Sequence, residues 1–230
     1  MTDLSRPQRA ALEAVARRFS ATWESNPPRA WLRLAHQRVA VEIATLNRNR
    51  APHNRAKPRL RFDKAVIRLM ERLKAALRET VPDGFTVLLT VTAPIRLPAK
   101  TAAALEEKIQ YLLTRPSPDR DQKHTIHGNR VRIRTVKHES SQAPKILGFV
   151  HNSDTDPLLL FNMARELLDL PSGRAAKLPS DRWLVLISAA ESSCLDAYRY
   201  IYSQLRPVTN FKKVVMVFSD GRIAALADTP

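Results

Sequence analysis

Glu42 is an acidic residue whose surroundings call for a chemical explanation. It lies within the apolar run at residues 39–46, where a strand is predicted. A carboxylate in such a strand costs desolvation energy unless it has a cationic partner, a metal ion or a water-filled cleft. Metal-dependent chemistry would need a second carboxylate and a group near the attacking water. Asp63 and Lys64 are the candidates that follow in the chain, and Glu13 is a further source of a carboxylate.

A simpler interpretation gives Glu42 a structural role. Arg33 and Arg38 flank the turn that precedes its strand, and either guanidinium would neutralise the carboxylate in an internal salt bridge. This interpretation predicts no chemistry at Glu42.

The segment at residues 47–61 carries basic side chains without any acidic residue to balance them. It also contains two prolines and little apolar content, so an exposed loop is expected. Unrelieved repulsion between cations favours contact with an anion such as phosphate over a merely solvated face. The candidate contacts are Arg48, Arg50, Arg55, Lys57, Arg59 and Arg61, continued by Lys64 at the start of the next helix.

A second basic group alternates with apolar residues. Arg130, Arg132 and Arg134 are separated by Val131 and Ile133. In a strand, successive side chains point to opposite faces, so the arginines form a ladder on one face. This arginine ladder is a further candidate for phosphate contact, and an exposed face braced by nearby acids is the alternative.

The overall charge points to the same class of partner. The chain has 38 Lys and Arg against 22 acidic residues, and residues 29–78 hold 14 of the basic and only 3 of the acidic ones. DNA or RNA is the expected partner, because release of counterions from phosphates favours binding to a basic surface. An anionic membrane surface is the rival partner for such a charge, but no apolar run is long enough to span a bilayer and no membrane partner is expected. The single cysteine, Cys194, and a start without signal-peptide features indicate a cytoplasmic protein.

Other chemistries lack a matching pattern. The five glycines are not grouped, which argues against a phosphate loop or a dinucleotide fingerprint. The spacing of His124, His127, His138 and His151 matches no recognised zinc pattern.

Periodicity predicts alternating helices and strands. Helices are expected at 6–23, 62–79, 99–114, 157–170 and 192–205, and strands at 30–35, 39–46, 85–91, 130–137, 145–150, 183–188, 212–218 and 223–226. The first two strands are expected to form a hairpin, and the turn residues at 127–129 predict a second hairpin.

The order of helix, hairpin with Glu42 and distant strand beginning at Trp183 resembles the PD-(D/E)XK, or restriction-endonuclease-like, nuclease superfamily. The resemblance covers residues 6–46 and, loosely, 157–227. It implies a mixed α/β fold with a central sheet flanked by helices, over one domain at 1–230 with residues 85–150 as an elaboration. It also implies that Glu42 would bind Mg²⁺ or Mn²⁺ if the nuclease activity is intact.

Two signature positions depart from that family. Arg29 stands where the first metal-binding Asp would follow Pro28, and Ala44 stands where the family places Lys. The sequence therefore predicts a catalytically degenerate, nucleic-acid-binding protein on a nuclease-like fold. The alternatives are an active Mg²⁺-dependent endonuclease that uses Glu42, and a scaffold or accessory subunit that binds a protein partner in a nucleoprotein complex.

Overall fold

The chain divides into two compact units in the computed structural model. Unit 1 comprises Met1–Arg50 and Leu170–Pro230, and unit 2 comprises Ala51–Asp169. The middle region expected at residues 85–150 falls inside unit 2. The structure describes residues 4–26, 29–46, 61, 64–114, 120–138, 143–153, 156–170, 181–205 and 211–228.

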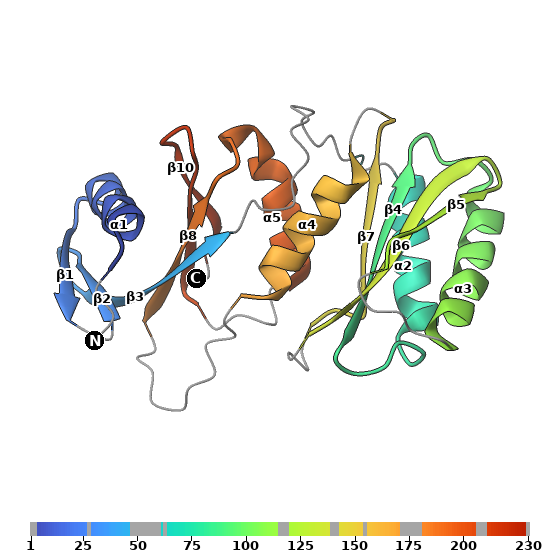
Figure 1. Cartoon of the computed structure of the whole chain (residues 1–230), viewed down its shortest axis with the longest axis horizontal. Coiled ribbons are helices and arrows are strands. Elements are labelled where there is room, and N and C mark those ends of the chain that lie inside the picture. Colours follow the sequence, from blue (N-terminus) through green and yellow to red (C-terminus); the bar gives the residue numbers. More distant parts are fainter. Residues whose placement is uncertain are drawn as a thin grey trace. The chain divides into compact units, whose positions relative to one another are not determined.

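The described part of unit 1 is built on a six-stranded mixed sheet, with strand order β1-β2-β3-β8-β9-β10. The first three strands are antiparallel, β3, β8 and β9 are parallel, and β10 returns antiparallel to β9 (Figure 1). The strands are β1 (Thr22–Asn26), β2 (Arg29–Arg33), β3 (Arg38–Leu46), β8 (Arg182–Ser188), β9 (Lys213–Val217) and β10 (Ile223–Asp228).

Helices cover both faces of this sheet. Helix α1 (Arg6–Arg18) packs Leu12 and Val15 against Val41 and Val185 in one apolar core. Its start is fixed by the Ser5 N–H, which donates to Gln8 Oε1 at 2.9 Å. On the other face lies α5 (Leu195–Leu205), which follows the short 3-10 helix η1 (Ser192–Cys194) and packs along β10 (Figure 1).

The predicted hairpin is confirmed. Strands β2 and β3 pair antiparallel, and Val41 lies beside Trp183 in the parallel pairing of β3 with β8. One boundary is wrong: the sequence predicts a helix to Trp23, but α1 ends at Arg18 and Trp23 belongs to β1. Ser20 adopts a positive φ of 51° after the helix, so the backbone turns there and Trp23 pairs with Leu32 instead.

The described part of unit 2 contains a four-stranded mixed sheet with strand order β5-β6-β4-β7. Strand β4 pairs antiparallel with β6 and parallel with β7, and β5 pairs antiparallel with β6. The strands are β4 (Phe85–Thr92), β5 (Gln122–Ile126), β6 (Asn129–Lys137) and β7 (Ile146–His151). A mixed α/β fold is therefore confirmed.

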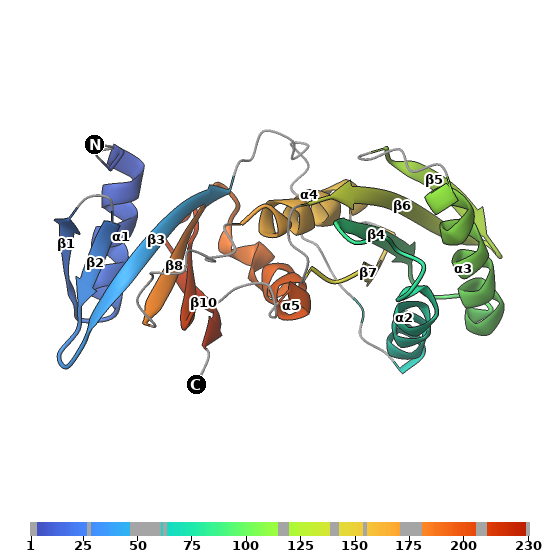
Figure 2. The same ribbon diagram turned by 90° about the horizontal axis from the view of Figure 1, so that it is seen from below.

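The two faces of the second sheet are covered differently. Helices α2 (Lys64–Leu77) and α3 (Pro98–Thr114) pack together on one face, where their apolar side chains enclose a core with β4, β6 and β7 (Figure 2). Gly148 of β7 allows this approach, because a Cβ there would meet the Met70 side chain. Helix α4 (Pro157–Leu168) packs on the opposite face against β4, β6 and β7.

None of the helices in the described ranges is both long and apolar enough to cross a bilayer.

Candidate anion-binding pocket

The β5–β6 hairpin presents the arginine ladder, and its turn chemistry explains its geometry. His127 and Gly128 both have positive φ, 47° and 76°, as a two-residue hairpin turn of the primed type requires. The buried Asn129 side chain then fixes the hairpin to the segment before α3. Its Oδ1 accepts from the Arg96 N–H at 2.8 Å, and its Nδ2 donates to the Arg96 and Ile126 carbonyls and to Thr101 Oγ1.

The predicted alternation along β6 is confirmed. Val131 and Ile133 are buried in the core under α2 and α3, whereas Arg130 is exposed and Arg132 is partly exposed. In the adjacent strand, Lys123 lies directly opposite Arg132. Like charges in facing positions of a sheet repel each other. The hairpin thus concentrates cations at one place on the sheet.

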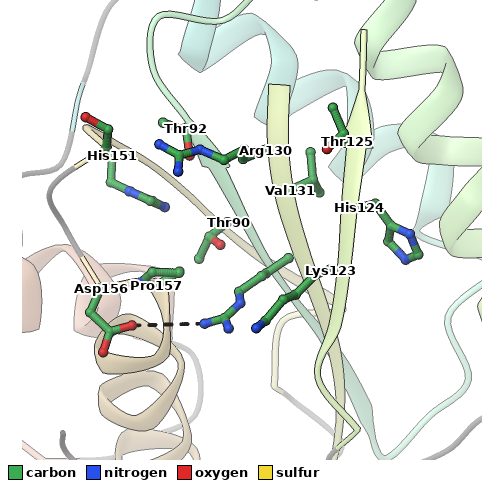
Figure 3. A pocket seen from close by; sticks show the side chains of 12 residues that line it. Thr90, Thr92, Lys123, His124, Thr125, Arg130, Val131, His151, Asp156 and Pro157 are labelled. Atoms are coloured by element: carbon green, nitrogen blue, oxygen red, sulfur yellow. Dashed lines mark ion pairs between the residues drawn. The ribbon is translucent and has the colours of Figure 1, made fainter. Parts of the chain in front are cut away.

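These cations line a pocket of about 460 Å³ beside the N-terminus of α4 (Figure 3). Its volume lies within the roughly 300–1,000 Å³ typical of small-ligand sites. Most of its lining residues carry a charged, hydroxyl or imidazole group. The lining residues are Thr90, Thr92, Lys123, His124, Thr125, Arg130, Val131, Arg132, His151, Ser153, Asp156 and Pro157.

Arg132 is held in place by two carboxylates. Its Nη2 lies 3.3 Å from Asp121 Oδ2, and its Nη1 lies 4.0 Å from Asp156 Oδ1. Only 14% of its side chain is exposed. Asp156 Oδ1 also accepts from the Leu158 N–H at 2.9 Å and so caps α4. The arginine at the centre of the ladder is therefore braced and oriented.

Arg130 and Lys123 differ from Arg132 in this respect. Both side chains are exposed, and neither has an ion pair with any part of the chain that the structure describes. Lys123 lies opposite Arg132 in the strand pair, and Figure 3 shows Arg130 on the side of His151. An oxyanion in the pocket would give both cations a partner, and arginine is suited to phosphate because its guanidinium forms paired hydrogen bonds.

His151 ends strand β7 and is buried, with 3% of its surface exposed. Its Nδ1 lies 2.6 Å from the backbone oxygen of Asn152. Burial lowers the pKa of the imidazole below its ordinary value, and the nearby guanidinium groups of Arg130 and Arg132 act in the same direction. The ring is therefore neutral at pH 7.

Two residues of this region have other surroundings. The Arg134 guanidinium lies 5.3 Å from the Phe161 ring centre, so the third arginine of the ladder packs on α4 and does not line the pocket. His124 lies on the other side of β5 from Lys123 (Figure 3), and burial together with Lys108 lowers its pKa.

Glu42 forms an ion pair in unit 1, but with a different partner from those expected. Its Oε1 lies 2.8 Å from Arg182 Nη1, and the Arg182 guanidinium also lies 4.9 Å from the Phe211 ring. Arg33 and Arg38, the partners suggested by the sequence, instead bind Glu24 at 2.7 and 3.2 Å. The sheet register accounts for these contacts: Arg33 lies on β2, the strand next to Glu24, and Arg38 of β3 faces Arg33 across the turn.

The surroundings of Glu42 do not fit a metal ion. The Arg182 guanidinium is paired with the Glu42 carboxylate. The described residues contain no group of three His, Cys, Asp or Glu side chains that could hold a cation. Lys64 is exposed at the start of α2, and Arg61 is exposed with its N–H bound to the Val150 carbonyl at 2.8 Å. The remaining predicted site residues, Asp63, Arg48, Arg50, Arg55, Lys57 and Arg59, lie outside the described residues.

No known family model, curated protein or solved structure matches this chain. The pocket must therefore be interpreted from its own chemistry.

Several pocket residues were not predicted as site residues. Lys123 lies outside the strands that the sequence predicts, although it belongs to β5, and His151 is considered there only as a metal ligand. A strand before the turn at 127–128 would have placed Lys123 opposite Arg132, so a hairpin register was an available signal. The sequence contains no comparable signal for His151, because β7 joins the site through its parallel pairing with β4.

Proposed function

We propose that this protein binds nucleic acid through its phosphate backbone, and that the pocket between the β5–β6 hairpin and the start of α4 is a principal contact. The observation that carries the proposal is the convergence of Lys123, Arg130 and Arg132 on one pocket wall. Asp156 is the acidic residue among the lining residues, and its carboxylate is already engaged with Arg132 and the helix cap.

Repulsion between the cationic side chains of the pocket supports this proposal. Lys123 and Arg132 repel each other across the strand pair, and Arg130 adds a further cation on the same face. Asp121 and Asp156 compensate Arg132, but the structure describes no carboxylate paired with Lys123 or Arg130. A bound phosphate diester would offset this repulsion. The formal net charge of +16 would strengthen the attraction at low salt.

The ion pair of Glu42 favours binding without efficient metal-dependent cleavage. Phosphodiester hydrolysis by Mg²⁺ needs anionic ligands, and the contact from Arg182 competes with a cation for this carboxylate. We therefore place the protein, as a proposal, among catalytically degenerate nuclease-like proteins. The endonuclease and the scaffold hypotheses remain predictions that the same experiments address.

The test compares two doubly substituted proteins that lose the same charge. Lys123→Ala/Arg130→Ala removes two pocket cations, whereas Lys100→Ala/Arg17→Ala removes two exposed cations that do not line the pocket. Fluorescence anisotropy with single- and double-stranded DNA and RNA measures affinity at low salt. The proposal predicts a loss of roughly ten-fold or more for the pocket variant, at about 1 kcal/mol or more per charged contact, and a much smaller loss for the control.

Equal losses in the two variants would show that net charge alone drives binding and would refute the pocket. No binding by the parent protein would refute the function itself, and a stoichiometric protein partner recovered with it would favour the scaffold hypothesis.

A further inference from the structure

We infer that the pocket selects RNA over DNA, because His151 Nε2 accepts a hydrogen bond from a ribose 2′-OH while Arg130 and Lys123 hold the adjacent phosphate. This inference rests on the proposed function and specifies its ligand. It gives His151 a role in binding, whereas phosphate binding by the pocket cations alone would not need this neutral side chain.

The tautomer of His151 follows from its partner. A backbone carbonyl oxygen can only accept a hydrogen bond, so the 2.6 Å contact with the Asn152 oxygen requires the proton on Nδ1. In a neutral ring Nε2 then carries a lone pair and no proton. The structure gives Nε2 no partner among the described residues. Figure 3 shows the ring projecting from the end of β7 toward the interior of the pocket.

The pocket therefore offers two opposite kinds of hydrogen-bonding group. Arg130, Arg132 and Lys123 donate to anionic oxygen, whereas His151 Nε2 accepts from a ligand that carries a proton. An internal DNA phosphodiester has acceptor oxygens and no O–H group. RNA adds a 2′-hydroxyl beside each phosphate, and this hydroxyl distinguishes RNA from DNA in protein sites. RNA thus matches both kinds of group in the pocket.

A phosphate monoester at a chain end is another source of an anion with an attached proton. It would present a P–OH group to Nε2 and its remaining oxygens to the arginines. The two sources share their chemistry but differ in position, because the 2′-OH occurs along the whole RNA chain. Oligonucleotides with and without a 5′-phosphate therefore separate them.

The main test changes the ligand and leaves the protein intact. A short single-stranded uridine oligomer is compared with its 2′-deoxy and 2′-O-methyl forms, which keep the base and the phosphates but lack the O–H donor. We expect the ribose form to bind about five-fold more tightly at pH 7.5, the size of one net hydrogen bond. Equal affinities with tight binding would overturn RNA selection while leaving the proposed function intact. Failure of all forms to bind would overturn both.

Two variants of His151 test the assigned atom. In His151→Asn the side-chain amide can still donate to the Asn152 carbonyl, but nothing remains at the position of Nε2. In His151→Gln the amide oxygen can take the place of Nε2. We expect His151→Asn to lose the preference for RNA and to retain affinity for the deoxy form, whereas His151→Gln retains part of the preference.

The deoxy form also controls for folding, because a collapsed pocket would lose affinity for both ligands. If the variant loses affinity for both ligands, the comparison of the ribose, 2′-deoxy and 2′-O-methyl oligomers with the unsubstituted protein decides whether the pocket selects RNA. An RNA preference that persists unchanged in a folded His151→Asn protein, or that depends on a 5′-phosphate, would overturn the inference.

Discussion

Removing the Glu42 carboxylate distinguishes a structural role from a catalytic one. In Glu42→Ala the Arg182 guanidinium loses its partner at 2.8 Å, while only 5% of the Arg182 side chain is exposed. Removing one member of a buried ion pair destabilises the folded state. The variant is therefore expected to be less stable whether or not the protein has any nuclease activity.

The size of this effect follows from burial. Breaking a fully buried pair costs roughly 3–5 kcal/mol. The Glu42 side chain is 26% exposed, and Arg182 keeps its contact with the Phe211 ring, so we expect the smaller value of about 2–3 kcal/mol. For a chain of this length such a loss lowers the melting midpoint by roughly 5–10 °C.

Urea denaturation and thermal melting measure this loss, and Glu24→Ala is the matched control. Glu24 also pairs with arginines, but its side chain is 38% exposed and that of Arg33 is 65% exposed, so its removal should cost less than about 1 kcal/mol. Parallel assays with labelled DNA and RNA in Mg²⁺ or Mn²⁺ measure cleavage. Unchanged stability of Glu42→Ala, together with cleavage by the parent that disappears in the variant, would refute the structural interpretation.

Three further predictions concern unit 2. Asn129→Ala should lower the unfolding free energy by about 2–3 kcal/mol in urea denaturation, because the Arg96 N–H and carbonyl lose their partner; a change below about 0.5 kcal/mol would contradict this. Burial, together with the guanidinium groups of Arg130 and Arg132, lowers the folded-state pKa of His151 despite the opposing effects of the Asn152 hydrogen bond and Asp156, so the unfolded chain binds the extra proton more readily. Stability should therefore fall as the pH decreases through about 6.5, and His151→Asn should weaken that dependence in urea titrations at several pH values. Gly148→Ala should cost about 1–3 kcal/mol by calorimetry, because the new methyl group meets the Met70 side chain; a neutral result would show that Met70 moves aside easily.

Local patterns predicted much of the fold. Alternation along β6 and the turn at residues 127–128 predicted a hairpin with the arginines on one face, and both are confirmed. The apolar run from Trp183 predicted a strand, and that strand pairs in parallel with the strand of Glu42. Trp23 was assigned wrongly because its spacing from Phe19 fits a helix, and the positive φ at Ser20 has no clear sequence signal.

The site depended on contacts between distant segments, which a single sequence does not specify. Glu42 needed a cation, and the sequence offered the nearby Arg33 and Arg38, but the partner is Arg182, 140 positions further along. Arg132 forms ion pairs with Asp121, which precedes it in the sequence, and with Asp156, which follows it. His151 reaches the pocket because β7 pairs with β4. Pairing between strands that are distant in the sequence determines the positions of Glu42 beside Arg182 and of His151 in the pocket.

The salt dependence of binding tests the central claim most directly, since each phosphate neutralised by a cation adds to the slope of log Kd against log salt concentration. For single-stranded RNA the slope changes by about 0.7 per contact. Between about 50 and 200 mM salt, Lys123→Ala/Arg130→Ala should therefore show a slope shallower by about 1.4 than the parent protein. Lys100→Ala/Arg17→Ala should keep the parental slope. Identical slopes for the parent and both variants would contradict phosphate binding by this pocket.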